Sequence, residues 1–282
     1  MQLPKKPPGA RPKYDKRSLS YANSFENGLQ STTIRAIEWV TGKIPIIRMV
    51  REFERRGGAE GIAFWRAALD VMGIEITTPP EQLAHIPKEG PVVVVANHPH
   101  GLVDGMILAE MISRVRPDFQ ILTREVLTGL DEIASSFLIP VPFPHDKDAQ
   151  AKFKQMRAKA MDRLASGGLI CVFPSGVVAS SRTAFGPVVE AEWNVFTAQM
   201  IRRADAAVVP IHFHGQNSRA YQIANRLSPT LRQALLLHEV VKACNRPHGP
   251  VIGPPLTAEQ LAPLKTDPRG FIAWLREHTL SL

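Results

Sequence analysis

A histidine and an aspartate follow an apolar run at a spacing that could support proton transfer, at His98 and Asp104. A histidine beside a carboxylate is the minimal general base, because the carboxylate orients the ring and stabilises the imidazolium that forms when the ring takes a proton. Pro99 and Gly101 favour a turn between the two residues. His100, four residues before Asp104, is a second candidate for the base. A histidine that only packs at a strand end is the structural alternative.

Two later loops also combine glycine with polar residues directly after apolar runs. Glycine allows a ligand to approach the backbone closely, and backbone amides in such a loop can stabilise an oxyanion. An arginine there can pair with a phosphate. An ordinary turn is the alternative for each loop alone, whereas three polar loops at successive strand ends favour a binding site. The residues concerned are Phe173, Pro174, Ser175, Gly176 and Arg182 in the first loop, and Gly215, Asn217 and Ser218 in the second.

The elements that position these loops are predicted from alternating β-branched runs and helical patterns that begin near residue 90. The runs lack polar alternation, so the strands are expected to be buried on both faces of a mostly parallel sheet. Ligand sites in such sheets gather in loops at strand ends. The predicted fold class is therefore α/β, with a mostly parallel central sheet flanked by helices. The four runs are residues 91–96, 119–123, 168–173 and 206–213.

Helices are expected before the sheet, over residues 25–40, 46–55 and 59–72, with Gly42 and Pro45 interrupting the first. The second helix could lie in a bilayer interface, its apolar face in the acyl region and its arginines on phosphates. Its arginines are Arg48, Arg51 and Arg55. The alternative is a helix that covers the core with its charges in water. We expect a disordered tail at 1–17, a membrane-facing helical layer at 18–78 and the main domain at 79–282.

Composition limits the class of protein. The chain has 282 residues, of which 44% are hydrophobic, so it can bury a core. No apolar run approaches the roughly 18 residues of a membrane span, and no apolar stretch follows the basic N-terminus as in a secretory signal. Residues 1–17 carry +5 of the formal charge of +8, so the rest of the chain is only mildly basic. A nucleic-acid-binding domain would carry a basic stripe along its fold, and we therefore expect no nucleic-acid partner. Such a tail suits anionic lipid or an acidic carrier protein. The cytoplasm is the expected compartment.

Taken together and in order, NHPHGLVDG, FPSG and VVPIHFHGQNS resemble blocks of the glycerolipid acyltransferase superfamily, over about residues 80–256. The closer likeness is to its bacterial hemolysin-like and lysophospholipid acyltransferase branch. That branch shows Asn-His-Pro with aspartate six positions after histidine. The resemblance implies a glycerol-3-phosphate acyltransferase-like fold and an enzyme that needs no cofactor. It also implies acyl carrier protein or acyl-CoA as donor, and a lysolipid hydroxyl as acceptor.

Roles carry over by position from this resemblance. His98 resembles the base that deprotonates the acceptor hydroxyl, and Asp104 its orienting partner. The residues that resemble the acceptor-binding blocks are Arg124, Phe173, Pro174, Ser175, Gly176 and Arg182. Those that resemble the fourth block are Pro210, Gly215, Asn217 and Ser218. The usual Phe-Pro-Glu-Gly-Thr-Arg block has Ser175 for glutamate and Val177 for threonine here, which argues against lysophosphatidate as acceptor.

The predicted function is acyl transfer from a thioester to a lipid hydroxyl, at the inner face of the cytoplasmic membrane through peripheral contact with anionic lipid. The alternatives are a catalytically inactive lipid-binding protein at the membrane surface and a thioesterase or lipid hydrolase. A metal site is not expected, because His212 and His214 would point to opposite faces of a strand and no HExxH or paired-cysteine spacing occurs. Ser175 lacks the first glycine of a Gly-x-Ser-x-Gly nucleophile motif.

Overall fold

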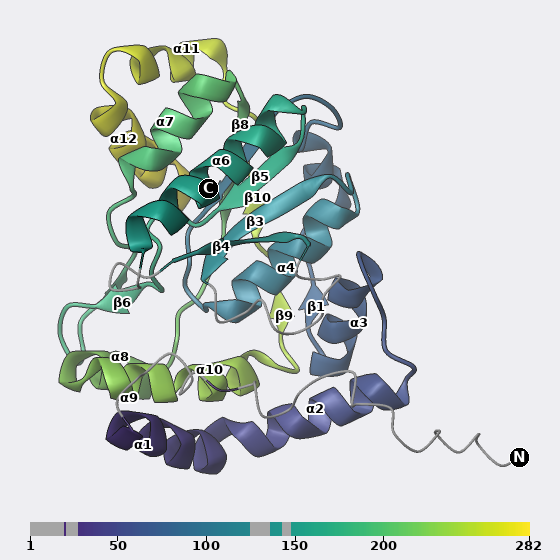
Figure 1. Cartoon of the computed structure of the whole chain (residues 1–282), viewed down its shortest axis with the longest axis vertical. Helices are drawn as coiled ribbons and strands as arrows, with labels where there is room; N and C mark the ends of the chain where they lie inside the picture. The colour runs from purple at the N-terminus through teal and green to yellow at the C-terminus, as the bar shows by residue number, and fades with distance from the viewer. Residues whose placement is uncertain (1–19, 21–27, 125–135, 143–147) are drawn as a thin grey trace, which may run out of the picture.

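The computed structural model describes residue 20 and residues 28–124, 136–142 and 148–282; the expected tail at 1–17 lies outside this range. A six-stranded sheet forms its centre (Figure 1). Its strands, in spatial order, are β10 (Val251–Ile252), β8 (Ala207–His212), β2 (Val92–Ala96), β5 (Leu169–Val172), β3 (Phe119–Arg124) and β4 (Leu138–Val141). Only β10 runs antiparallel to its neighbour. The predicted α/β fold and mostly parallel sheet are confirmed, and each of the four expected runs contains a strand.

Both faces of the sheet are buried, as the unbroken apolar runs predicted. Successive side chains of a strand point to opposite faces. In β2, Val92 and Val94 pack with α3 (Ala63–Met72) and α4 (Leu102–Ser113). Val93 and Val95 pack on the other face, which α6 (Ala149–Ala165), α7 (Val195–Ala204) and α12 (Pro268–Leu280) cover. This double burial holds the carboxyl ends of the strands, and the loops that follow them, in one place.

The N-terminal helices form a continuous rod, which corrects the expected interruption at Gly42 and Pro45. The rod comprises α1 (Gly28–Glu38), a π-helical turn (Trp39–Lys43) and α2 (Ile44–Arg55). Pro45 lies in the first turn of α2, where its missing N–H group costs no hydrogen bond of the α-helix. Of the first expected helix, residues 25–27 lie outside the described residues.

Three further helices lie beside this rod: α8 (Arg219–Leu227), α9 (Pro229–Ala234) and α10 (Leu236–Ala243) (Figure 1). The π-helical turn packs against α10, and α1 packs against α9. Gly42 is at the contact, where a Cβ would lie 2.8 Å from the backbone nitrogen of His238. A residue without a side chain is therefore required at Gly42 for this close approach.

Short elements complete the described chain. β1 (Glu75–Ile76) pairs in parallel with β9 (Pro247–His248), and β6 (Ser180–Ser181) pairs antiparallel with β7 (Val188–Val189). The remaining helical segments are two 3-10 turns, Pro80–His85 and Ala262–Lys265, and α11 (Ala258–Leu261). Within the described ranges, no helix is both long enough and apolar enough to cross a bilayer.

Candidate active site

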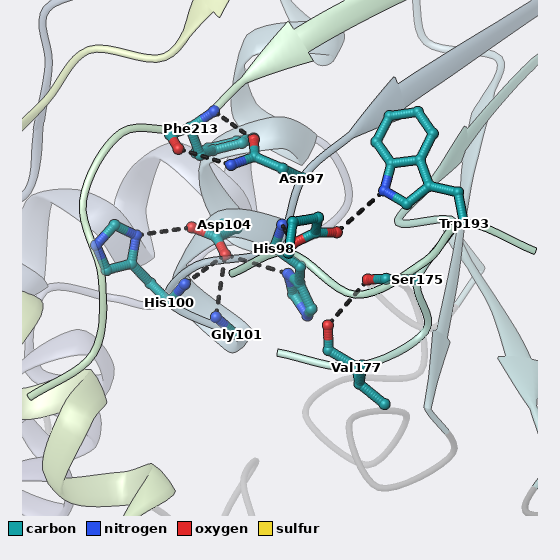
Figure 2. A network of polar contacts seen from close by, with 10 residues as sticks. Asn97, His98, His100, Gly101, Asp104, Ser175, Val177, Trp193 and Phe213 are labelled. Carbon is teal, nitrogen blue, oxygen red and sulfur yellow. Dashed lines mark hydrogen bonds and ion pairs between the residues drawn. The ribbon is translucent and has the colours of Figure 1, made fainter. Parts of the chain in front are cut away.

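The loop after β2 is tied to the loop after β8 by one buried side chain, Asn97. Its Nδ2 donates to the carbonyl oxygen of Phe213 at 2.9 Å, and its Oδ1 accepts from the Phe213 amide at 2.7 Å (Figure 2). The two strands are parallel neighbours, with Val95 opposite Pro210, so their carboxyl ends meet. Asn97 thereby fixes the start of the segment that carries His98. Sequence reasoning placed Asn97 at the strand end but did not assign it this contact.

Asp104 lies in the first turn of α4 and presents one carboxylate to both candidate histidines (Figure 2). Its side chain is fully buried. Oδ2 accepts the backbone N–H groups of His100 at 2.8 Å and Gly101 at 3.0 Å. The ring Nδ1 of His100 lies 3.0 Å from Oδ1, and Nδ1 of His98 lies 3.1 Å from Oδ2. The structure therefore brings His98 and Asp104 together, and adds His100 to the same carboxylate.

The pKa values of this group follow from burial and from the shared contact. Burial by itself raises the pKa of Asp104, but the hydrogen bond with His100 and the close approach of the His98 ring outweigh it and lower the pKa to about 2. Burial lowers the pKa of His100, while the Asp104 carboxylate and, more weakly, Glu239 raise it to a net value above 6.5. Asp104 is thus ionised at neutral pH. A carboxylate at Nδ1 leaves Nε2 of each ring as the atom for proton exchange.

His98 is held by Phe173 and by residues that the sequence analysis did not single out. Its ring stacks on Phe173, with centroids 4.0 Å apart and planes inclined by 27°. Its backbone N–H donates to Glu190 Oε2 at 3.2 Å, and its carbonyl oxygen accepts from the amide of Ala179 at 2.8 Å. The buried Glu190 also accepts from the indole of Trp193 at 3.1 Å. The loop around Phe173 therefore positions the His98 ring.

His100 has a different environment. A Cβ on Gly215, whose φ is +101°, would lie 2.8 Å from His100 Nε2, so the loop after β8 closes over this ring. The ring of His248 meets it edge to face at 5.5 Å. Burial lowers the pKa of His248, with a smaller effect in the same direction from His100. Gly215 of the fourth block thus contacts His100.

The segment from Phe173 to Val177 forms a tight turn in which two donors bond to carbonyl oxygens of the same segment. The amide of Gly176 donates to the carbonyl oxygen of Phe173 at 2.9 Å, and Ser175 Oγ donates to the carbonyl oxygen of Val177 at 3.0 Å (Figure 2). The Gly176 amide itself closes the turn, and the expectation that backbone amides near Gly176 contact an oxyanion stays a prediction. Pro174 is buried in the same turn.

The two arginines of the predicted acceptor site lie in separate elements. Arg124 is the last residue of β3. Arg182 follows β6 and is exposed, and its carbonyl oxygen accepts from Arg226 at 2.7 Å. The described contacts do not join Arg182 to His98 or Asp104.

In the fourth block, Pro210 and Ser218 make hydrogen bonds that stabilise the fold, and Asn217 carries a side-chain donor without an acceptor among the described residues. Pro210 lies inside β8, and its carbonyl oxygen accepts from Gly253 at 2.9 Å. Ser218 caps α8, and its amide donates to Glu239 Oε2 at 2.8 Å. Asn217 is buried, and its Nδ2 has no acceptor among the described residues.

A cavity of about 350 Å³ lies beside this block. Its walls come from the end of β8, the loop that follows it, α10 and the segment that leads to β10. His100, but not His98, is among its lining residues. Its polar lining includes His100, Asn217, Glu239, Lys242, Arg246 and His248.

Candidate metal ligands do not gather in the part of the chain that the structure describes: no three His, Cys, Asp or Glu side chains are placed to hold an ion. One expectation about these residues is wrong. The rings of His212 and His214 lie 4.4 Å apart, because side chains two residues apart along an extended chain project to the same side and not to opposite sides.

The part of the chain that carries this site is similar to known proteins. A model of the Acyltransferase family matches residues 80–214, which include β2, the His98 loop, β5 and β8. A lyso-glycine lipid O-acyltransferase of Bacteroides thetaiotaomicron is 28% identical over 173 residues, covering 58% of each chain. One of Phocaeicola vulgatus is 26% identical over 167 residues, covering 58% of this chain and 56% of that protein. The chain thus matches less than two thirds of either relative's length.

Among solved structures, the 1-acyl-sn-glycerophosphate acyltransferase PlsC of Thermotoga maritima is similar, with a TM-score of 0.43 and 14% identity over 78% of each chain. The family match spans the strands and loops that hold His98, Asp104, Phe173 and Pro210. Residues 80–214 of this chain, which are less than half of its length, are therefore similar to the Acyltransferase family.

Proposed function

We propose that this protein transfers a fatty acyl group from an acyl thioester to a hydroxyl of a lysophospholipid or related lysolipid. The observation that carries the proposal is the His98 ring beside the buried Asp104 carboxylate, inside the segment that matches the family. The two relatives named as lyso-glycine lipid O-acyltransferases support a lysolipid acceptor. Acyl carrier protein or acyl-CoA is the proposed donor, with no further cofactor.

In the proposed mechanism His98 acts as the general base. Its Nε2 takes the proton of the acceptor hydroxyl while that oxygen attacks the thioester carbonyl carbon. The tetrahedral intermediate then collapses, the carbon–sulfur bond breaks, and the His98 imidazolium returns the proton to the departing thiolate. Asp104 orients the His98 ring through Nδ1 and stabilises the imidazolium. General-base assistance of this kind raises the rate by about 10²–10⁴-fold. Backbone amides near Gly176 or in the Gly215 loop are the candidates for oxyanion contacts.

We further propose peripheral contact with anionic membrane at the cytoplasmic face, since the acceptor resides in a bilayer. The exposed residues Val40, Ile44, Arg48 and Arg51 lie along one stretch of the N-terminal rod at roughly helical spacing. Arg55, also expected to contact phosphates, is paired with Glu52 at 2.6 Å. Arg48 and Arg51 are therefore the stronger candidates on α2.

The test is an acyl-transfer assay on the purified full chain and three variants: His98→Ala, His100→Ala and, as a matched control, His278→Ala on α12. Each is incubated with long-chain acyl carrier protein or acyl-CoA and a panel of lysolipids, and mass spectrometry identifies the new diacyl product. We expect the product to vanish in His98→Ala and to persist in His278→Ala. If the product vanished in His100→Ala but still formed in His98→Ala, His100 would be the general base.

Other outcomes would replace the proposed function. Free fatty acid from the wild type without acylated lipid would identify a thioesterase. No turnover with any acceptor, together with vesicle binding, would indicate a lipid-binding protein that has lost catalysis.

A further inference from the structure

The cavity beside His100 contains two cations for which the described chain provides no counterion. Lys242 lies in the last turn of α10, and Arg246 follows that helix; both are exposed at the cavity. No described carboxylate lies within ion-pair distance of either side chain. Two neighbouring positive charges repel each other, and this repulsion is relieved when an anion binds between them.

The nearest acidic group of the cavity is already engaged. Glu239 is buried, and its two oxygens accept from the amide of Ser218 at 2.8 Å and from the Ser218 hydroxyl. It contributes a negative charge to the cavity without a direct contact to Lys242 or Arg246. With one acid and two bases, these three side chains carry a net charge of +1, which suits a monoanion.

A buried donor points to the same conclusion independently of the charges. Asn217 lines the cavity and is 2% exposed, yet its Nδ2 has no acceptor among the described residues. Buried polar groups are nearly always hydrogen-bonded, so an unused donor in a cavity wall indicates an acceptor that arrives with a ligand. The oxygen of a carboxylate or of a phosphodiester supplies such an acceptor.

Size and position restrict which part of a substrate fits. A volume of about 350 Å³ with mostly polar walls accommodates a head group but not an acyl chain. The cavity reaches His100, which shares the Asp104 carboxylate with His98. An occupant of the cavity therefore lies next to the proposed catalytic group, on the side of Asp104 away from the His98–Phe173 stack.

We propose that this cavity binds the monoanionic head group of the acyl acceptor, with Lys242 and Arg246 supplying charge and Asn217 a hydrogen bond. The inference rests on the proposed acyl transfer and assigns its acceptor specificity. It also agrees with the departure of Ser175 and Val177 from the family pattern, because the charge that recognises the acceptor comes from Lys242 and Arg246 and not from Arg182.

The test compares head-group selectivity in the full chain. Three acceptors share one hydroxyacyl tail and carry a carboxylate, a phosphodiester or a neutral carboxamide head. Wild type, Lys242→Ala, Arg246→Ala and the double variant are assayed with one donor, and Arg202→Ala on α7 is the matched control. We expect the wild type to favour at least one anionic head over the carboxamide. We expect the double variant to lose at least tenfold in kcat/KM on that anion, mainly through KM, with the carboxamide unchanged. Lys242→Arg should retain the preference.

Several results would overturn the inference. These are an equal loss on all three head groups, no loss on any, or a rise in the KM of the donor in place of the acceptor. Binding separates this failure from a failure of the proposed function. A soluble short-chain N-acylglycine, a phosphodiester of the same chain length and the neutral carboxamide are titrated by calorimetry into the wild type and the double variant. Binding that selects at least one of the two anions over the carboxamide, and that the double variant loses, supports the head-group site even if the wild type transfers no acyl group. Absent or unselective binding rejects it.

Discussion

Asp104 serves two rings with one buried carboxylate, and the two rings are held by different parts of the fold. His98 stacks on Phe173 after β5, whereas His100 lies under Gly215 after β8. The carboxylate also accepts hydrogen bonds from two backbone N–H groups, so four contacts hold it in position. A side chain held in this way stabilises a charge that develops on either ring.

Replacing Asp104 with asparagine tests that role at constant size. The asparagine side chain would have one acceptor oxygen for the contacts that two carboxylate oxygens now make, and it would carry no charge to stabilise an imidazolium. We expect Asp104→Asn to lower kcat by about 10²–10⁴-fold, the range for losing general-base assistance. Initial rates with saturating donor and acceptor measure the loss, and circular dichroism checks that the variant is folded. A loss below tenfold would contradict the assignment.

The raised pKa of His100 predicts how stability depends on pH. Burial lowers this pKa, but the Asp104 carboxylate raises it to a net value above 6.5, so the folded protein binds a proton at His100 more tightly than the unfolded chain. The stabilisation is complete below the unfolded pKa of about 6.5 and is lost as pH rises through the folded value. We expect the difference in free energy of unfolding between wild type and His100→Asn to be largest at low pH and to shrink toward pH 8.5.

Urea unfolding at half-unit steps from pH 5.5 to 8.5 measures this difference, with His278→Asn as the matched control. A difference that stays constant or grows with pH would show that His100 does not gain a proton-linked interaction on folding.

At the scale of elements, the contact between the π-helical turn and α10 decides how the N-terminal rod is attached. At Gly42 a Cβ would lie 2.8 Å from the backbone of both Leu237 and His238, and backbone atoms of a packed helix cannot easily give way. The carbonyl oxygen of Thr41 also lies 3.1 Å from His238 Nδ1. The rod and α10 are therefore interlocked, and α10 also carries Lys242 into the cavity.

Gly42→Ala is expected to destabilise the protein by about 1–3 kcal/mol, the usual cost of overpacking a tight contact. The matched control is Gly28→Ala at the start of α1, where a Cβ would meet nothing within 4 Å. Denaturant unfolding measures both. Equal stability of the two variants would show that the rod moves away from α10 without cost.

At the scale of the whole molecule, Figure 1 shows the N-terminal rod along one side, with the sheet and α7 further away. The rod exposes Trp39, Val40 and Ile44 next to the arginines of α2. Apolar side chains beside cations are what an anionic bilayer surface binds. This side of the molecule would then be the one that approaches the lipid.

The prediction concerns vesicle binding. We expect Arg48→Ala/Arg51→Ala to bind anionic vesicles at least about tenfold more weakly than wild type, since each cation near such a surface contributes about 1 kcal/mol. Arg202→Ala/Arg203→Ala on α7 is the matched control and should bind normally. Sedimentation with vesicles at rising salt measures both, and wild-type binding should weaken as salt screens the charges. Binding that is unaffected by salt or by the α2 variants would exclude this surface.

The sequence by itself determined the sheet and the position of the loops that matter. Unbroken apolar runs such as 91–96 require strands buried on both faces, and parallel strands place their carboxyl ends at one edge. His98, Phe173 and Gly215 could therefore be assigned to one site before the strand order was known. The same reasoning failed at Gly42 and Pro45, because helix-breaking tendencies are local and the packing of α10 against the rod is not.

Only the tertiary structure decided which side chains meet at that site. Asp104 contacts His100 as well as His98, the Gly176 amide is used inside its own turn, and Asn97 bonds to a backbone 116 residues away. The cavity also depends on long-range contacts. Lys242 on α10 and Arg246 after it line the same cavity as the loop that follows β8. Periodicity reports which face of an element is buried. The choice of partner depends on strand order, loop path and helix packing, which no local pattern in a single sequence encodes.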